Sequence, residues 1–449
     1  MLVILHGWSD NAGSFGSLAK KLSKPAPDGI GAEIKEVRLG DYISLDDRVR
    51  FDDLADALAR AWDDQNLPTD PRSVDAIVHS TGGLVLRHWM VRNFLPGEAP
   101  VKRLLMLAPA NFGSPLAHTG RSFFGRAVKG WKGTRLFETG RHILKGLELA
   151  SPFTWNLAMA DLLGEGRYFG PGAVLCTVLT GNAGFKGIAS IANKAGSDGV
   201  VRVASANLNA NKLSLDFSDF PDQWVLTTDE ASHSSAAFGI MDREDHSTIA
   251  GKNRGPRNRE TWPFFRDALL VEDESFETWQ QKLQAHNEAV SKAAERRRGS
   301  HSDSYQNLVV QVSDTHGQPV QDYLIEFYMN DDHSRRDQGL TQRLQEEVIT
   351  NVHTCSEDAS SRAMLINCTR LYKLFSREGD RLNISITAFP DINIRKNLVG
   401  YKTYTDNDIG SLSLSREQLA SLFRPHATTL LSVKIRRYQD EKVFRFRKV

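Results

Sequence analysis

Apolar and amphipathic segments alternate along residues 1–275 of the chain. Short apolar runs with the length of buried strands lie at Leu2–Leu5, 32–39, 74–78, Val101–Leu107 and 174–179. Helical spacing of the apolar residues between these runs predicts helices at 15–22, 51–62 and 82–91. This alternation predicts an α/β fold, in which a mostly parallel sheet has right-handed crossovers and helices on both faces. Active sites of such sheets lie at the carboxyl ends of the strands.

The apolar period changes to two beyond a charged helical segment at 276–298 and a polar linker at 299–304. Strand-like runs follow at 308–312, 323–328, 382–389 and 430–435, separated by polar turns. We therefore predict an α/β domain over residues 1–275, a helix and linker over 276–304, and an all-β sandwich over 305–449.

Composition narrows the class of protein. The 449 residues carry 56 Lys and Arg against 55 Asp and Glu, which gives no support to a nucleic-acid binder. The three cysteines fit a reducing compartment, and Cys355 and Cys368 would pair only in an exported protein. The first residues lack the features of a signal peptide, and no stretch approaches the roughly 18 apolar residues that span a bilayer. We expect a protein that is cytoplasmic as synthesised. Export by a route that needs no signal peptide is compatible with this sequence.

The segment DAIVHSTGGLV at residues 75–85 has the features of a nucleophile turn. An apolar strand ends at Ser80 and a helix begins directly after it, which would thrust the serine hydroxyl out above the sheet. Such a sharp turn needs small neighbours, and Gly82 and Gly83 satisfy this need on one side. Val78 departs from the usual G-x-S-x-G pattern on the other side. Ser80 is the candidate nucleophile, and a serine that only caps a helix is the alternative.

Two backbone N–H groups are candidates for an oxyanion hole. In this architecture one donor comes from the loop after the first strand, and the other comes from the residue that follows the nucleophile. These positions are Trp8, in the HGW segment at 6–8, and Thr81. Gly7 would let the backbone approach a reacting carbonyl closely.

A serine nucleophile also needs an imidazole that a buried carboxylate orients. The fold requires the chain order serine, acid, histidine. Asp198, in SDGVV at 197–201, is the candidate acid, and Asp229 is the reserve candidate. His246, in DHSTI at 245–249, is the candidate base, and His233 is its main competitor.

Taken together, these motifs resemble bacterial lipases of the α/β-hydrolase superfamily. The resemblance covers roughly residues 1–270 and also includes APANFGSP at 108–115. It is strongest to the branch related to GPI-inositol-deacylase-like and lecithin–cholesterol acyltransferase-like enzymes, which includes phospholipase effectors of bacterial secretion systems. The resemblance implies an α/β-hydrolase fold in which Ser80, Asp198 and His246 serve as nucleophile, acid and base.

The reaction that follows is transfer of an acyl group from an ester to the serine and then to water. We expect His6, Gly7, His79 and Phe112 to contact the substrate. We expect no metal and no other cofactor, because the histidines and carboxylates show no convincing ligand spacing.

The segment 114–170 interrupts the α/β pattern and is expected to form a helical lid over the active site. Basic and aromatic residues are interleaved in it, as in Arg121, Phe123, Phe124, Arg126, Lys129, Trp131, Lys132, Arg135 and Phe137. This composition suits contact with anionic headgroups and acyl chains, so we expect a lipid ester as substrate and contact of the lid with a membrane surface. A solvated helical cap is the alternative.

Three other functions fit the same residues. One is an esterase or thioesterase for small acyl groups, and another is an acyltransferase in which an alcohol replaces water. The third is an inactive hydrolase fold that binds a protein partner through the C-terminal β domain, and Val78 is the feature that favours it.

Overall fold

The computed structural model describes residues 1–5, 15–26, 29–44, 46–119, 140–219, 225–228, 235–251, 256–296, 303–329, 338–376, 380–388 and 412–436. The chain forms two compact units. Unit 1 consists of residues 1–210, 231–304 and 426–428, and unit 2 consists of residues 211–230, 305–425 and 429–449.

Unit 1 is built on a parallel sheet with the strand order β2-β1-β3-β4-β5-β8. Its strands are β1 (Leu2–Leu5), β2 (Ile34–Val37), β3 (Val74–His79), β4 (Val101–Leu107), β5 (Leu175–Gly181) and β8 (Ala237–Met241). The chain enters at β1, beside the edge strand β2, and the strands from β3 to β8 then extend the sheet in the other direction, as in doubly wound folds. The parallel sheet predicted for this region is confirmed, and β8 adds a strand that the sequence pattern did not predict.

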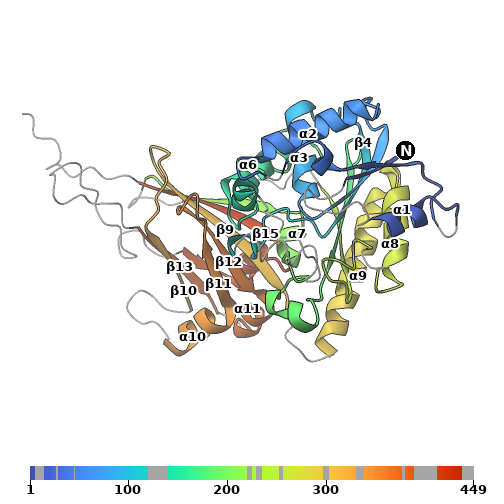
Figure 1. Cartoon of the computed structure of the whole chain (residues 1–449). Coiled ribbons are helices and arrows are strands. Elements are labelled where there is room, and N and C mark those ends of the chain that lie inside the picture. Colours follow the sequence, from blue (N-terminus) through green and yellow to red (C-terminus); the bar gives the residue numbers. More distant parts are fainter. Residues whose placement is uncertain are drawn as a thin grey trace, which may run out of the picture. The chain divides into compact units, whose positions relative to one another are not determined.

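Helices cover both faces of this sheet (Figure 1). The larger helices are α1 (Gly16–Leu22), α2 (Phe51–Asp64), α3 (Gly82–Asn93), α5 (Arg141–Gly146), α6 (Pro152–Asp161), α8 (Thr261–Leu270) and α9 (Phe276–Arg296). Shorter helical turns are η1 (Leu39–Asp41), η2 (Ala117–Thr119), η3 (Gly187–Ala192), α7 (Val203–Ala206) and η5 (Asp273–Ser275). Side chains of α1, α8 and α9 share one apolar core with alternate residues of β1, β3, β4 and β5. Apart from the edge strand β2, the strands are buried on both faces, which explains their nearly continuous apolar sequences.

Helix α9 belongs to unit 1 and is not a free connecting helix. Phe276, Trp279 and Leu283 are buried in the core beside the sheet, at the spacing of one helix face. The Trp279 indole N–H also donates to the Thr177 hydroxyl over 2.9 Å. The boundary predicted at residue 275 therefore lies inside the packed unit, because this apolar stripe is part of its core.

Unit 2 contains two sheets that share one apolar core. One sheet has the order β10-β13-β14, with β10 (Tyr323–Met329), β13 (Leu382–Ala388) and β14 (Leu412–Leu414). The other has the order β11-β12-β9-β15-β6-β7, with β11 (Ile349–Thr354), β12 (Ser361–Asn367), β9 (Tyr305–Asp314), β15 (Thr428–Ile435), β6 (Asn211–Phe217) and β7 (Val225–Thr228). The helical segments are α10 (Gln338–Arg343), η6 (Leu344–Val348), α11 (Cys368–Leu374) and α13 (Arg416–Leu422).

Strands β6 and β7 belong to unit 2, although they lie outside the predicted β domain at residues 305–449. β6 pairs in parallel with β15, so that Leu213 lies opposite Leu431. Leu213, Leu215 and Phe217 point into the core of the two sheets. A segment in the middle of the α/β sequence therefore completes the β unit, because its alternating apolar residues are buried there.

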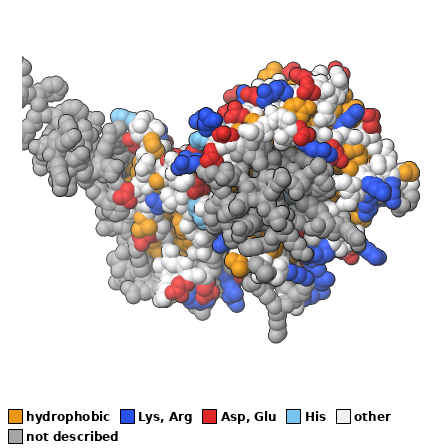
Figure 2. Space-filling view, viewed as in Figure 1, with side chains coloured by type: hydrophobic (Ala, Val, Ile, Leu, Met, Phe, Trp, Pro, Cys, Tyr) orange, Lys and Arg blue, Asp and Glu red, His pale blue; other side chains and the backbone are white. Residues whose placement is uncertain are grey.

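Acidic and basic side chains are interspersed on the surface of unit 1. Figure 2 shows this mixture over the region where Figure 1 labels α2. There Arg92 lies 3.4 Å from a carboxylate oxygen of Asp52 and 3.2 Å from one of Asp56. Such exposed pairs contribute little stability, each on the order of 0–1 kcal/mol. In the described part of the chain, no helix is long and apolar enough to cross a membrane.

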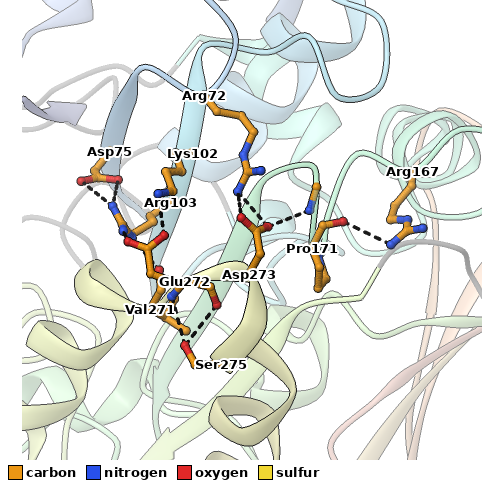
Figure 3. A network of polar contacts seen from close by, with 11 residues as sticks. Arg72, Asp75, Lys102, Arg103, Arg167, Pro171, Val271, Glu272, Asp273 and Ser275 are labelled. Carbon is orange, nitrogen blue, oxygen red and sulfur yellow. Dashed lines mark hydrogen bonds and ion pairs between the residues drawn. The ribbon is translucent and has the colours of Figure 1, made fainter.

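A polar network joins the amino ends of β3 and β4 to the segment that leads into α9 (Figure 3). Glu272 binds both Lys102, over 2.6 Å, and Arg103. Asp273 accepts hydrogen bonds from Arg72 over 2.6 Å and from the Gly172 N–H over 2.7 Å. The network lies at the amino ends of the strands, away from the carboxyl ends where active sites of such sheets are found. It therefore serves stability and not catalysis.

Asp273 offers a test of this role. Burial works to raise its pKa, but the Gly172 N–H and Arg72 outweigh burial and hold the pKa below its ordinary value. The stabilisation is therefore present above about pH 4 and is lost as the pH falls through the lowered pKa. We expect Asp273→Asn to lower the melting temperature at pH 7 by roughly 2–4 °C, the effect of about 1 kcal/mol.

The difference between this variant and the unmodified protein should shrink in melts below about pH 4, because protonation then removes the same interaction. Glu274→Gln, at an exposed neighbouring residue, is the matched control and should change the melting temperature little at either pH. An equal loss from Asp273→Asn at both pH values would contradict the ionic role.

Candidate active site

Ser80 occupies a strained turn between β3 and α3. Its φ is 54°, in the left-handed region that non-glycine residues rarely adopt. The turn is held by two backbone hydrogen bonds, from the Ser80 N–H to the Leu107 carbonyl over 3.1 Å and from the Gly83 N–H to the Ser80 carbonyl over 3.2 Å. Strain of this kind persists only where the surroundings enforce it, and it is concentrated at functional sites.

Gly82 and Val78 are neighbours in the elbow. A Cβ atom built on Gly82 would lie 3.7 Å from the Val78 Cβ and 3.6 Å from the Leu5 carbonyl oxygen. One built on Gly83 would lie only 3.1 Å from the Pro109 Cβ. The contact at position 82 is an ordinary van der Waals distance, whereas Gly83 packs closely on Pro109. The elbow thus accommodates valine at position 78 in place of the glycine of the G-x-S-x-G pattern.

His246 lies between Ser80 and Asp198. Its Nε2 is 3.1 Å from the Ser80 Oγ, and its Nδ1 is 3.0 Å from the Asp198 Oδ2. The His246 N–H also donates to the Asp198 carbonyl over 2.9 Å. Asp198 and His246 are fully buried and Ser80 is nearly so. This is the arrangement in which a carboxylate fixes the imidazole tautomer and the imidazole can take a proton from the serine.

The Asp198 carboxylate is held by its own turn. Its Oδ1 accepts the N–H groups of Val200 and Val201 over 2.9 and 2.8 Å, which leaves Oδ2 for the imidazole. Gly199 has a φ of 101°, and a Cβ there would lie 2.7 Å from the Phe185 ring. The SDGVV motif therefore needs glycine for both conformation and space.

The other predicted site residues fall into two groups. His6, Gly7 and Trp8, together with the reserve candidates Asp229 and His233, lie outside the described residues. Thr81 directly follows Ser80 at the N-terminus of α3, where backbone N–H groups have no partner within the helix. The Thr81 N–H remains the predicted second donor to the oxyanion.

Phe112 and His79, predicted to contact the substrate, are both buried. The Phe112 N–H donates to the Ser205 carbonyl over 2.9 Å. The His79 Nε2 lies 2.9 Å from the His246 carbonyl oxygen, and the two imidazole rings are 4.7 Å apart. The structure therefore gives both side chains a packing role, and it gives His79 a direct hold on the backbone of the candidate base.

Two carboxylates that the sequence analysis did not single out shape the loop that carries His246. Glu244 is buried and accepts the N–H groups of Arg257 and Asn258 over 3.1 and 2.7 Å. Asp245 accepts the Thr248 N–H over 2.9 Å and binds the Arg257 guanidinium over 2.6 Å. These bonds fix the loop on both sides of the imidazole. Only Asp245 could have been found from the sequence, because it is part of the DHSTI motif.

A buried ion pair connects α3, the helix that follows Ser80, to α6. Arg87 of α3 binds Asp161 at the end of α6 through two hydrogen bonds of 2.7 and 2.8 Å, and both side chains are fully buried. Arg87 also donates to the Asn111 amide oxygen over 3.3 Å, and the Asn111 amide donates to the Ala206 carbonyl over 2.7 Å. Burial raises the pKa of Asp161 in spite of Arg87. This network connects α3 to the base of the 114–170 insertion.

Within the described residues no cluster of His, Cys, Asp and Glu has the arrangement of a metal site. The three cysteines are buried and unpaired with one another. The hydrogen-bonded series Asp198, His246 and Ser80 is suited to nucleophilic attack by a serine that a histidine deprotonates.

Comparison with known proteins gives the fold but no sequence family. No family model and no curated protein matches the chain. The phospholipase PlaB from Legionella pneumophila aligns over 100% of this chain and 95% of its own, with a TM-score of 0.79 and 23% identity. This chain has an α/β-hydrolase fold. The alignment extends over unit 2 as well, so the α/β unit with an added β unit is the shared architecture.

Two further structures were compared. PlaB in complex with thio-NAD gives the same TM-score of 0.79 and covers 100% of this chain and 96% of its own, at 23% identity. The mature lipase BlEst2 of Bacillus licheniformis covers 60% of this chain and 91% of its own, with a TM-score of 0.36 and 16% identity.

The buried ion pair leads to a stability prediction. Asp161→Ala leaves the Arg87 charge buried without its partner, which should cost about 3–5 kcal/mol. Urea unfolding followed by tryptophan fluorescence measures the loss. Replacing both partners, as Arg87→Met with Asp161→Leu, should restore much of the stability because no charge is left unpaired. A double variant as unstable as Asp161→Ala would contradict this account.

The contact of His79 with the His246 carbonyl leads to a second prediction. His79→Phe keeps a ring but removes the donor, so we expect fluorophosphonate to label Ser80 roughly 10- to 100-fold more slowly, as for a misplaced catalytic group. His79→Gln retains an N–H donor and should recover part of the rate. Equal labelling rates in the Phe and Gln variants, with both folded by circular dichroism, would show that the hydrogen bond has no positioning role.

Proposed function

We propose that the chain is a serine hydrolase that cleaves carboxylic esters of lipids. The observation that carries this proposal is the hydrogen-bonded series Asp198, His246 and Ser80, with the serine on a strained elbow at the carboxyl end of β3. Three residues distant in sequence meet there with distances suited to proton transfer. A structural role does not explain why the strained residue should be the one whose hydroxyl faces the imidazole.

In the proposed reaction, His246 takes the Ser80 proton as the serine oxygen attacks the ester carbonyl carbon. The resulting oxyanion accepts hydrogen bonds from the Thr81 N–H and, in this proposal, from the Trp8 N–H. His246 then returns the proton to the departing alcohol, which leaves an acyl group on Ser80. Water, deprotonated by His246, releases the acid and restores the serine.

Two observations favour a lipid ester over a small soluble ester. PlaB, which aligns with a TM-score of 0.79, is named a phospholipase. The insertion at 114–170 also carries interleaved basic and aromatic residues, which suits contact between a lid and an anionic membrane surface. Contact of unit 2 with a protein partner is a further part of the proposal. The well-formed elbow beside Val78 removes the reason for favouring an inactive fold.

Labelling of the purified protein with a fluorophosphonate probe tests the nucleophile. We expect stoichiometric labelling of the unmodified protein and none in Ser80→Ala, because the probe reacts only with an activated serine. Ser73→Ala, at an exposed serine near the start of β3, is the matched control and should label fully. Labelling that persists in Ser80→Ala would assign the reactive group to another residue.

A series of phospholipids and p-nitrophenyl esters of increasing chain length then tests the substrate class. A lipid hydrolase should prefer long chains presented on vesicles, whereas a small-substrate esterase should be fully active on short soluble esters. Acyl transfer to an added alcohol in preference to water would identify an acyltransferase.

A further inference from the structure

Unit 1 contains a cationic pocket of about 730 Å³ beside the loop of the candidate base. Its walls come from the loops that follow β5 and β8 and from the segment that precedes α8. The charged residues that line it are Lys186, Arg243, Arg257, Arg259, Asp242 and Glu260. Four cationic groups and two carboxylates line it, and Arg257 is also paired with Asp245, so the remaining excess of positive charge attracts an anion.

Several of these cations are available to a ligand. Within the described residues, Lys186 and Arg259 form no ion pair, and both side chains are exposed. Arg243 is largely exposed, and its Nε lies 3.7 Å from the Asp242 carboxylate. Asp242 also accepts a hydrogen bond from the Asn182 amide over 3.1 Å, so part of its charge is already compensated. Glu260 likewise has no ion pair in this part of the chain, and it faces the same space.

The walls of the cationic pocket are held in place by hydrogen bonds between side chains and the backbone. Arg243 has a φ of 63°, and its N–H donates to the Asn182 side chain over 2.8 Å. The Arg257 guanidinium donates to the Arg243 carbonyl over 3.1 Å. The buried Glu244 carboxylate accepts the N–H groups of Arg257 and Asn258, which belong to the opposite wall. The cations are therefore presented from a pre-organised surface, which lowers the cost of binding.

The cationic pocket and the candidate base share one short segment of chain. Arg243 precedes His246 by three residues, so their Cα atoms lie at most about 11 Å apart. Arg257 binds Asp245, the residue directly before His246. The cationic pocket therefore shares the loop after β8 with the candidate base, and a headgroup bound there would have to extend from this loop to the ester at Ser80.

We propose that the cationic pocket binds a phosphate group and that, resting on the proposed function, this group is the phosphodiester of an anionic phospholipid whose acyl ester is cut at Ser80. Arginine offers paired N–H donors that match two phosphate oxygens, and lysine adds a compact charge. A free phosphate compound has the same chemistry and could occupy the same place, so the test separates the two sources.

The first arm compares two lipids with identical acyl chains, dioleoyl-phosphatidylglycerol and dioleoylglycerol, in the same neutral vesicles. The measured quantity is the ratio of their hydrolysis rates. In the double variant Lys186→Glu, Arg259→Glu we expect this ratio to fall about tenfold or more, as charge-assisted hydrogen bonds are lost and repulsion replaces them. The control, Lys292→Glu with Arg296→Glu on the exposed side of α9, makes the same change of net charge and should keep the ratio.

The second arm measures the melting temperature with sodium pyrophosphate against sodium chloride of equal ionic strength. Stabilisation of the unmodified protein that disappears in the Lys186→Glu, Arg259→Glu variant, with an unchanged lipid ratio, would assign the pocket to a free phosphate compound. An unchanged ratio and no such stabilisation would overturn the proposal. An equal loss of both lipid activities would overturn the headgroup assignment. If the unmodified protein hydrolyses neither lipid, the proposed function fails, and the pyrophosphate arm alone decides whether the pocket binds phosphate.

Discussion

The left-handed conformation of Ser80 is the constraint on which the α/β unit depends. A non-glycine residue with a φ of 54° costs on the order of 1–2 kcal/mol, so its surroundings must offset that cost. The offset comes from the parallel strands that pair with β3, from the start of α3 and from the backbone hydrogen bonds of the Ser80 and Gly83 N–H groups. Because β3, β5 and β8 are parallel, the loops that carry Asp198 and His246 leave the sheet at the edge where this turn stands.

Buried charge gives the site its rigidity. Asp198, Glu244 and the Arg87–Asp161 pair are all withdrawn from water, and each has several hydrogen-bond partners. A satisfied polar network in a medium of low dielectric constant holds its members firmly, whereas a missing partner is costly. The imidazole is thus fixed through its side chain by Asp198 and through its carbonyl by His79. Such a site needs little reorganisation when charge develops on an attacked carbonyl.

Much of the α/β unit could be predicted from the sequence, because the apolar runs and motifs that indicate it are local. Apolar runs gave the strands β1 to β5, and short motifs drew attention to Ser80, Asp198 and His246. Strand β8 was missed, since it contains Gly239, which is unfavourable in a strand, and there a Cβ would lie 2.8 Å from Leu283 of α9. The bond between His79 and the His246 carbonyl joins positions 167 residues apart through a backbone atom, for which no side-chain pattern exists.

The pairing of β6 with β15 imposes an order on how this polypeptide reaches its final form. Strands β6 and β7 leave the ribosome long before β15, the strand with which β6 pairs. Until β15 is synthesised, one edge of β6 has no partner strand. Lys212 and Asp216 stand on the face of β6 away from the core, and charges there discourage pairing with a wrong strand. A fragment starting at residue 305 would carry the opposite defect, because β15 would become an uncovered edge and favour aggregation.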